Sequence, residues 1–186
     1  MLVKDSNKSV ENTSDELLKN RKGSFSLECD GIVTLAKEEG PFYKSGSPER
    51  NAIAGPGTPG KKLIVEGYVF NKDCQPMELA WLDFWQADGN GQYDNSGYNL
   101  RGHQYTDESG RYRLETVRPV EYGPRTAHIH VKVQASKNSP VLTTQLFLPE
   151  ERRNETDSIY DSALEMSIID TGDRQIATFN FVLGTD

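Results

Sequence analysis

Apolar residues occur in short runs from residue 62 to the end of the chain, separated by segments rich in Gly, Pro, Asn, Asp and Ser. Runs of this length with such boundaries are typical of β-strands. The segment 78–86 is bulky on both faces, which suits the middle of a sandwich. Many short strands with little helix indicate an antiparallel β-sandwich with long loops. The predicted strands are 62–70, 78–86, 111–117, 127–133, 142–148 and 176–183.

The polar segments between these runs predict loops and a tail. The segment 46–60 is rich in Gly and Pro and should be irregular. The stretch 87–110 is a longer polar segment, and loops of that length are usually functional or disordered. A short helix fits 157–164, with Asp157 or Ser158 as its N-cap. We expect 1–28 to be a tail or arm, with at most a short helix at 14–20, and 29–186 to be one catalytic β-sandwich domain.

Composition narrows the range of partners. The 186 residues suffice for one domain with a real core. The sequence lacks the roughly 20 successive apolar residues that a membrane helix needs, and a net charge of −7 argues against nucleic acid. The start of the chain lacks the apolar segment of a secretory signal, which favours a cytoplasmic location, with a processed secreted form as the alternative. Cys29 and Cys74 fit one disulfide or two free thiols equally well.

Two of the three histidines form the motif His128-Ile129-His130. On a strand, residues i and i+2 point to the same side, about 6–7 Å apart along the chain. The two imidazoles therefore share one face, and such a pair is a common start of a metal site. The alternatives are two hydrogen-bonded histidines without a metal, a zinc hydrolase that adds a carboxylate, and a non-catalytic binding module built on the same sandwich.

Tyrosine is a rare metal ligand, because its phenol has a pKa near 10 and must lose the proton. A hard, strongly Lewis-acidic cation such as trivalent iron makes that loss favourable. Tyr93 follows the predicted strand 78–86, and Tyr122 precedes His128 by six positions. Spacing alone does not select these two among the eight tyrosines of the chain.

A series of motifs, in order along the chain, resembles the intradiol ring-cleavage dioxygenases, the family of catechol, protocatechuate and hydroxyquinol dioxygenases. The matching segments are EGPFY at 39–43, LDFWQA at 82–87 with Tyr93, LRG at 100–102 with 106–112, TVRP at 116–119 with Tyr122, RTAHIH at 125–130 and TQL at 144–146. The segment between the two tyrosines is shorter than in many members, and an N-terminal helical dimerisation domain has no room here. The chain therefore resembles a small, single-domain member.

The resemblance implies a non-haem Fe(III) site, one ion per chain, with Tyr93, Tyr122, His128 and His130 as ligands. It also implies cleavage of catechol-type aromatic diols by O2 to cis,cis-muconate-type products, with the catecholic substrate and O2 as the only partners expected besides further copies of the chain.

The same resemblance gives roles to residues around the metal. Tyr122 would leave the metal and accept a substrate proton, and Arg125 would stabilise negative charge that develops on the ring. Gln145 would orient the substrate by hydrogen bonding. The expected substrate-binding residues are Gly40 and Pro41 at the entrance, and Arg101 and His103 toward a ring substituent.

Overall fold

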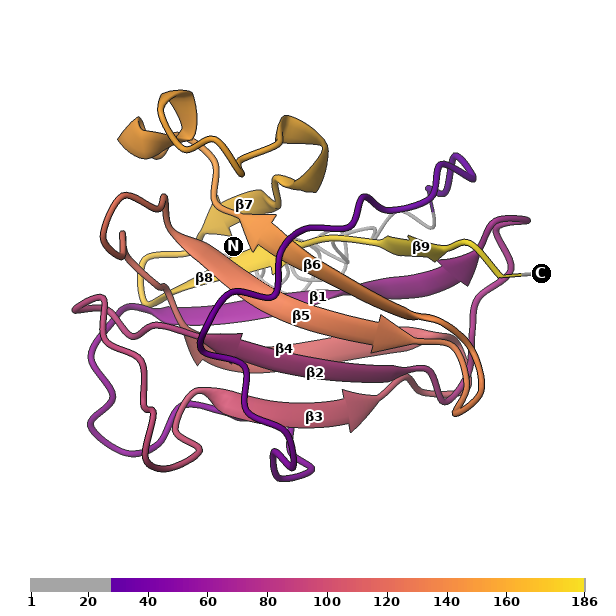
Figure 1. The fold of residues 1–186 in the computed structure, drawn as a ribbon, viewed down its shortest axis with the longest axis horizontal. Helices are drawn as coiled ribbons and strands as arrows, with labels where there is room; N and C mark the ends of the chain where they lie inside the picture. Colours follow the sequence, from indigo (N-terminus) through magenta and orange to yellow (C-terminus); the bar gives the residue numbers. More distant parts are fainter. Residues whose placement is uncertain (1–27, 186) are drawn as a thin grey trace, which may run out of the picture.

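The structure, a computed structural model that describes residues 28–185, consists of two β-sheets packed face to face (Figure 1). One sheet has four antiparallel strands in the order β3-β2-β5-β6. Its strands are β2 (Trp81–Gln86), β3 (Arg101–Tyr105), β5 (His128–Gln134) and β6 (Val141–Phe147).

The second sheet has five strands in the order β4-β1-β8-β7, with β9 beside the end of β1. Strand β1 pairs antiparallel with β4 but parallel with β8 and β9. The predicted β-sandwich is confirmed, and this sheet is mixed. Its strands are β1 (Lys62–Asn71), β4 (Arg111–Val117), β7 (Ser167–Asp170), β8 (Arg174–Thr178) and β9 (Phe181–Leu183).

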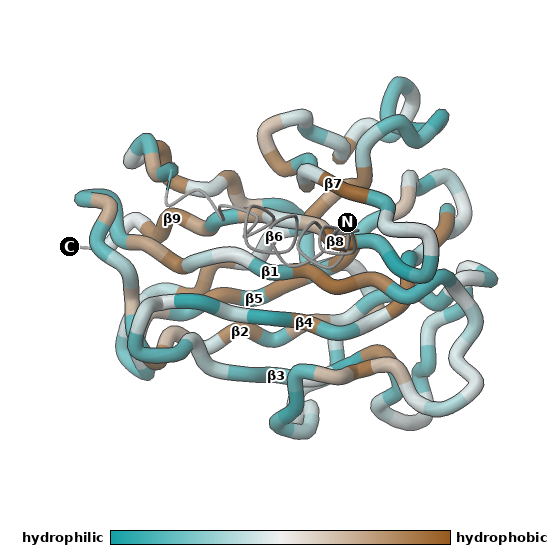
Figure 2. Tube along the Cα trace, turned by 180° about the vertical axis from the view of Figure 1, so that it is seen from behind, coloured by the Kyte–Doolittle hydropathy of each residue, from teal (hydrophilic) through white to brown (hydrophobic). Residues whose placement is uncertain are grey.

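The hydrophobic core lies between the two sheets, and Figure 2 shows hydrophobic stretches along β1, β2 and β5. On β5, alternate residues Ile129, Val131 and Val133 are completely buried in this core. Because side chains on a strand alternate, His128 and His130 lie on the opposite, outer face of the four-stranded sheet. The core therefore fixes the direction of the histidine pair.

The segment 34–50 crosses the outer face of the four-stranded sheet, and it runs in front of β6, β5 and β2 in Figure 1. The backbone N–H of Lys37 donates to Thr143 O on β6 at 2.9 Å. At the other end, Arg50 N donates to His103 O on β3 at 2.8 Å. The part of the outer face beneath this segment is thus covered, and Asp83, Trp85 and His130 are buried there.

A disulfide joins Cys29, before this crossing segment, to Cys74, in the turn after β1. The two residues are 45 positions apart in the sequence. The crossing segment is therefore held covalently near its start and by hydrogen bonds along its length. Of the two states that the sequence left open for the cysteines, the structure has the disulfide.

The structure corrects several predicted elements. The stretch 87–110 contains strand β3, and β7 was not predicted at all. The predicted strand 176–183 is two strands, because the chain leaves the ladder at Phe179 and Asn180. The predicted helix 14–20 and nearly all of the predicted tail lie outside the described residues. None of the helices between residues 28 and 185 is long and apolar enough to cross a membrane.

The prediction of one helix over 157–164 is wrong. The chain has a short 3-10 helix, Arg152–Glu155, and a second one, Ser162–Leu164, whose N-cap is Asp161. Asp157 accepts hydrogen bonds from Ile159 N at 2.9 Å and from Thr126 N at 2.8 Å. These hydrogen bonds hold the backbone after Asp157 in a turn, which competes with helix formation.

Candidate metal centre

Four side chains meet at one end of the outer face of the four-stranded sheet. His128 and His130 come from β5, Tyr93 from the loop after β2, and Tyr122 from the loop before β5. The ring centroids of Tyr93 and Tyr122 are 5.4 Å apart, and those of Tyr93 and His130 are 6.3 Å apart. The Oη atom of Tyr93 lies 3.5 Å from Nε2 of His128. The fold therefore brings together the four residues expected as metal ligands.

The two imidazoles point their Nε2 atoms at one another, 3.0 Å apart. His128 Nδ1 lies 2.6 Å from Thr126 O, so this nitrogen carries the proton and Nε2 presents its lone pair. Two ligand nitrogens about 2.1 Å from a metal ion, at right angles, would lie about 3.0 Å apart. The spacing of the pair is therefore that of two neighbouring ligands of one ion.

Both histidines are nearly inaccessible to solvent, and this burial lowers their pKa values. Burial brings the pKa of His128 down to about 4, with a smaller lowering effect from the Arg125 charge. Burial, then His128 and Arg125, hold the pKa of His130 well below its usual range. Both rings are therefore neutral near pH 7, which is the form that binds a metal ion.

Burial has the opposite effect on the phenol of Tyr93. It raises the pKa of Tyr93 above the ordinary value, although the charges of Arg125 and Arg101 lower it in part. The phenolate form therefore needs a strong cation beside it. Tyr122 is 37% exposed and lies on the solvent side of the centre.

The donor set fits a hard trivalent cation. Two neutral imidazoles and two phenols converge, and two phenolates would compensate two of the three charges of such an ion. Among residues 28–185, no three His, Cys, Asp or Glu side chains are grouped so as to hold a metal ion. The zinc hydrolase alternative therefore lacks its third ligand in the part of the chain that the structure describes.

Arg125 is fixed beside the centre by two side chains. Its Nη2 donates to Gln145 Oε1 at 2.5 Å, and its Nε donates to Asp157 Oδ2 at 2.8 Å. Gln145 is completely buried, and its Nε2 donates to Glu38 O at 2.7 Å. Burial alone would raise the pKa of Asp157, but hydrogen bonds from Ile159 N, Thr126 N and Arg125 outweigh it, so the pKa is lowered and the carboxylate stays charged.

Gly40 closes the centre from the crossing segment. Its φ of +71° lies in the left-handed region that glycine adopts without strain, and a Cβ at this position would be 3.5 Å from His130 Cε1. The next residue, Pro41, lines a surface hollow of about 460 Å³ together with Phe42 and Arg101. These two expected entrance residues do lie next to the centre.

Arg101 and His103 lie on β3, and the side chain of each is engaged in hydrogen bonds. Arg101 is buried, and it donates to Asp94 O at 2.9 Å and to Phe42 O at 2.5 Å, so it ties together the two loops beside the centre. His103 Nδ1 lies 2.8 Å from Ser47 O. On the neighbouring strand β2, His103 pairs with Asp83, whereas Arg101 pairs with Trp85. A role for either side chain in binding a ring substituent stays a prediction.

Some residues of the centre were not assigned from the sequence. The Phe42 ring stacks on Tyr93 at 4.5 Å and meets Tyr122 edge-on at 5.2 Å. The Trp85 ring lies parallel to His130, and Asp157 holds Arg125. Phe42 and Trp85 belong to the quoted motifs, and alternation on β2 would have placed Trp85 on the outer face. The sequence around Asp157 does not indicate its contact with Arg125, because the two residues are far apart in the sequence and are brought together by the fold.

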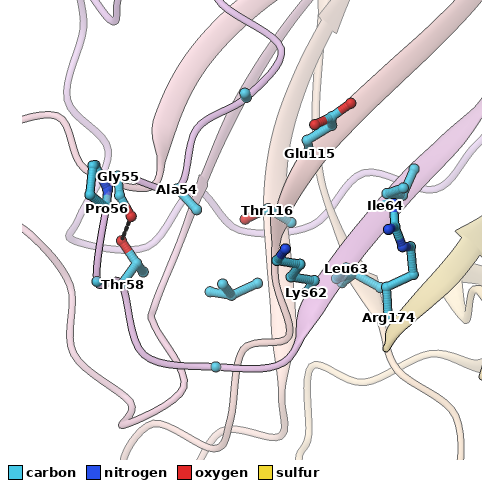
Figure 3. Close-up of a pocket in the computed structure, with 14 residues that line it drawn as sticks. Ala54, Gly55, Pro56, Thr58, Lys62, Leu63, Ile64, Glu115, Thr116 and Arg174 are labelled. Carbon is cyan, nitrogen blue, oxygen red and sulfur yellow. Dashed lines mark hydrogen bonds between the residues drawn. The ribbon is translucent and has the colours of Figure 1, made fainter. Parts of the chain in front are cut away.

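A separate pocket of about 430 Å³ lies between the loop 52–60 and strands β1 and β4 (Figure 3). Its charged residues are Lys62, Glu115 and Arg174, and Thr58 Oγ1 donates to Gly55 O at its edge. None of its lining residues belongs to the candidate metal centre. This pocket is therefore separate from the four residues expected as metal ligands.

Comparisons with known proteins show which proteins the chain resembles. A family model described as Dioxygenase matches residues 38–184. Catechol 1,2-dioxygenase from Acinetobacter baylyi is 32% identical over 137 residues, which are 58% of this chain and 44% of that protein. Hydroxyquinol 1,2-dioxygenase from Nocardioides simplex is 29% identical over 175 residues, covering 81% of this chain and 58% of that protein. The chain spans about half the length of the curated relatives it matches.

Two solved structures extend the comparison. The dioxygenase domain of a dioxygenase carbohydrate-binding protein fusion from Streptomyces sp. SirexAA-E is 46% identical, with a TM-score of 0.80, and the match covers 83% of this chain and 100% of that chain. 3-Chlorocatechol 1,2-dioxygenase from Rhodococcus opacus 1CP is 26% identical, with a TM-score of 0.74, and the match covers 82% of this chain and 73% of that chain.

Proposed function

We propose, since this chain belongs to the intradiol ring-cleavage dioxygenase family, that it cleaves catechol-type aromatic diols with O2 to cis,cis-muconate-type products. The observation that carries the proposal is the convergence of the Nε2 atoms of His128 and His130, 3.0 Å apart, beside two tyrosines. This donor set, which is free of carboxylates, matches a non-haem ferric ion better than zinc or calcium.

The proposed ligands are Tyr93, Tyr122, His128 and His130, with one ion per chain. When bound, ferric iron supplies the Lewis acidity that activates a catechol-type diol toward O2. The protein contributes neutral imidazoles, a buried phenol and an aromatic wall formed by Phe42, which packs on both tyrosines. Burial of the site strengthens every electrostatic interaction within it.

Tyr122 is the ligand that faces the substrate in this proposal. It is the more exposed of the two tyrosines and lies in a tight turn whose backbone pairs Tyr122 with Arg125. A phenolate at this position can accept a proton from an incoming diol and move away, while the more deeply buried Tyr93 stays in place. The two tyrosines thus have different duties because their burial differs.

Arg125 stabilises negative charge on the substrate ring in this proposal. Its guanidinium is held on two sides by Asp157 and Gln145, so the charge is in position before the reaction begins. Gln145 spends Oε1 on Arg125 and Nε2 on Glu38 O, so its first task is to hold Arg125. Gly40 lies against His130, and Pro41 lines the hollow beside it, so both would shape the entrance in this proposal.

The test is metal analysis followed by turnover. Protein loaded with ferric iron should reach an iron-to-chain ratio near unity and turn red to burgundy from phenolate-to-iron charge transfer. A panel of substituted catechols should then give O2 uptake and muconate-type products, and the panel also identifies the preferred ring substituent.

Two results would overturn the proposal. A colourless protein that takes up zinc in preference to iron would favour another metalloenzyme. Protein that is coloured and loaded, yet consumes no O2 with any catechol, would favour a non-catalytic binding module.

A further inference from the structure

The two histidines of the centre are held in different ways. His128 Nδ1 donates to the carbonyl of Thr126, which fixes both the proton and the plane of the ring. His130 Nδ1 is buried and has no hydrogen-bond partner among the described residues. Histidines that bind metal ions almost always donate this second N–H to an acceptor, which sets the orientation of the ring. The plane of the His130 ring must therefore be fixed by another contact.

Trp85 supplies such a contact. It is the register partner of His130 on the neighbouring strand β2, and β2 and β5 lie side by side in Figure 1. The two rings are parallel within 7°, with centroids 4.8 Å apart. Trp85 is 1% exposed, so the indole has little freedom to move. A buried indole presents a large, flat surface for a second ring.

The indole is held in turn by the segment that crosses the sheet. The ring of Tyr43 packs on Trp85 with a centroid distance of 4.8 Å. Tyr43 Oη donates to Asp83 Oδ2 at 3.1 Å, and Asp83 Oδ1 accepts from Ser47 Oγ at 2.7 Å. Two residues of the crossing segment thus bind a buried carboxylate on the same strand as Trp85. The position of the indole depends on that segment.

We propose that Trp85 is a positioning residue for the metal ligand His130, and that its indole orients the imidazole by stacking where other ligands use a hydrogen bond. The proposal rests on the ligand set of the proposed function. A metal ion takes the lone pair of His130 Nε2, so the ring must carry its proton on Nδ1, where the described residues offer no acceptor. Stacking fixes the ring plane without requiring that acceptor.

The experiment compares Trp85→Leu and Trp85→Phe with Trp81→Leu. Trp81 lies on the same strand and the same face, but its ring contact is with His103 at 6.3 Å, so it is a matched control. In metal-free protein labelled with ¹³C-histidine, the ring protons of His130 should be shifted upfield by the indole. Trp85→Leu should abolish that shift, and Trp81→Leu should leave it unchanged.

In ferric protein, the rate of iron release to a chelator and the phenolate charge-transfer band are measured. Trp85→Leu should accelerate release by about 10–100-fold, the usual effect of removing a group that orients a ligand. Its charge-transfer band should shift or broaden. Trp85→Phe retains a ring and should lie between wild type and Trp85→Leu. Melting temperatures show which variants are folded. If Trp85→Leu does not fold, Trp85→Phe is compared with wild type instead.

Release at the wild-type rate in Trp85→Leu would overturn the inference. Equal loss in the Leu and Phe variants would do so too, because a ring retained at position 85 would then have no advantage over an aliphatic side chain. A wild-type protein that binds no ferric iron would instead overturn the proposed function, while the signal of metal-free His130 would still report whether the stack exists.

Discussion

Of the four proposed ligands, His128 has the environment that leaves least freedom, because Thr126 O fixes its tautomer and burial keeps it neutral. We expect His128→Ala to lose ferric iron. The third histidine provides the control, since His103 bonds to Ser47 O outside the centre, and His103→Ala should keep the metal. Iron content after gel filtration measures both. Full iron occupancy in His128→Ala would show that the ligand set is wrong.

Loss of the Tyr122 hydroxyl group should affect turnover more than metal binding. Tyr122→Phe should keep much of the iron but slow turnover by about 10²–10⁴-fold, the range for removal of a proton-transferring group. Tyr105→Phe is a matched control, because Tyr105 ends β3 and is exposed. Steady-state O2 uptake measures the effect. A Tyr122→Phe enzyme with wild-type turnover would rule out the proton-accepting role.

The depressed pKa of His128 also predicts how stability depends on pH. In the unfolded chain the ring takes up a proton near pH 6.5, whereas the folded, metal-free protein resists it until about pH 4. The folded state is thus favoured fully above pH 6.5 and loses stability as pH falls from 6.5 to 4. The loss from this one ring is about 3 kcal/mol at the lower limit. Urea unfolding of metal-free wild type and His128→Gln at several pH values measures it. If the free energy of unfolding fell equally with pH in both proteins, His128 would not be the group responsible.

At the scale of elements, strand alternation is the part of the fold that the sequence predicts best. The pattern of 127–133 placed the histidine pair on one face, and the buried residues Ile129, Val131 and Val133 confirm it. Strand β3 was missed because its sequence, RGHQY, is polar and lacks the apolar alternation of a strand that packs on the core. The gathering of Tyr93 and Tyr122 depends on two loops, so only family resemblance could indicate it.

Gly67 explains why the chain has β8 and β9 and not one longer strand. A Cβ on Gly67 would lie 1.8 Å from Phe179 O, at the point where the neighbouring chain leaves the ladder. We expect Gly67→Ala to lower the free energy of unfolding by about 1–3 kcal/mol, because the backbone of 179–180 would have to move. In Gly184→Ala the Cβ would meet Val33 at 3.7 Å, an ordinary contact, and the change should stay within about 0.5 kcal/mol. Chemical denaturation measures both, and equal effects would refute this explanation of the break.

For the whole molecule, the disulfide between Cys29 and Cys74 restricts the unfolded chain. Closing a loop of 45 residues is worth about 4 kcal/mol in the chain-entropy description. The double variant Cys29→Ser with Cys74→Ser should lose stability of that order. It should also release iron faster, because the crossing segment carries Glu38, Gly40 and Tyr43 to the centre. Denaturation curves and chelator kinetics separate the two effects, and unchanged iron release would limit the disulfide to a general stabilising role.

The same cystine makes the fold sensitive to the redox conditions under which the protein is produced. Disulfides persist in oxidising compartments and are rare where thioredoxin and glutathione keep thiols reduced. A bond between Cys29 and Cys74 is therefore expected to form more readily under oxidising conditions than in a reducing cytoplasm. Protein produced in a reducing host cytoplasm should lack the disulfide and be less stable, whereas protein produced in a periplasm should have the disulfide. Surroundings that keep this cystine closed also keep iron ferric, so a single electrochemical environment would maintain both the scaffold and the proposed cofactor.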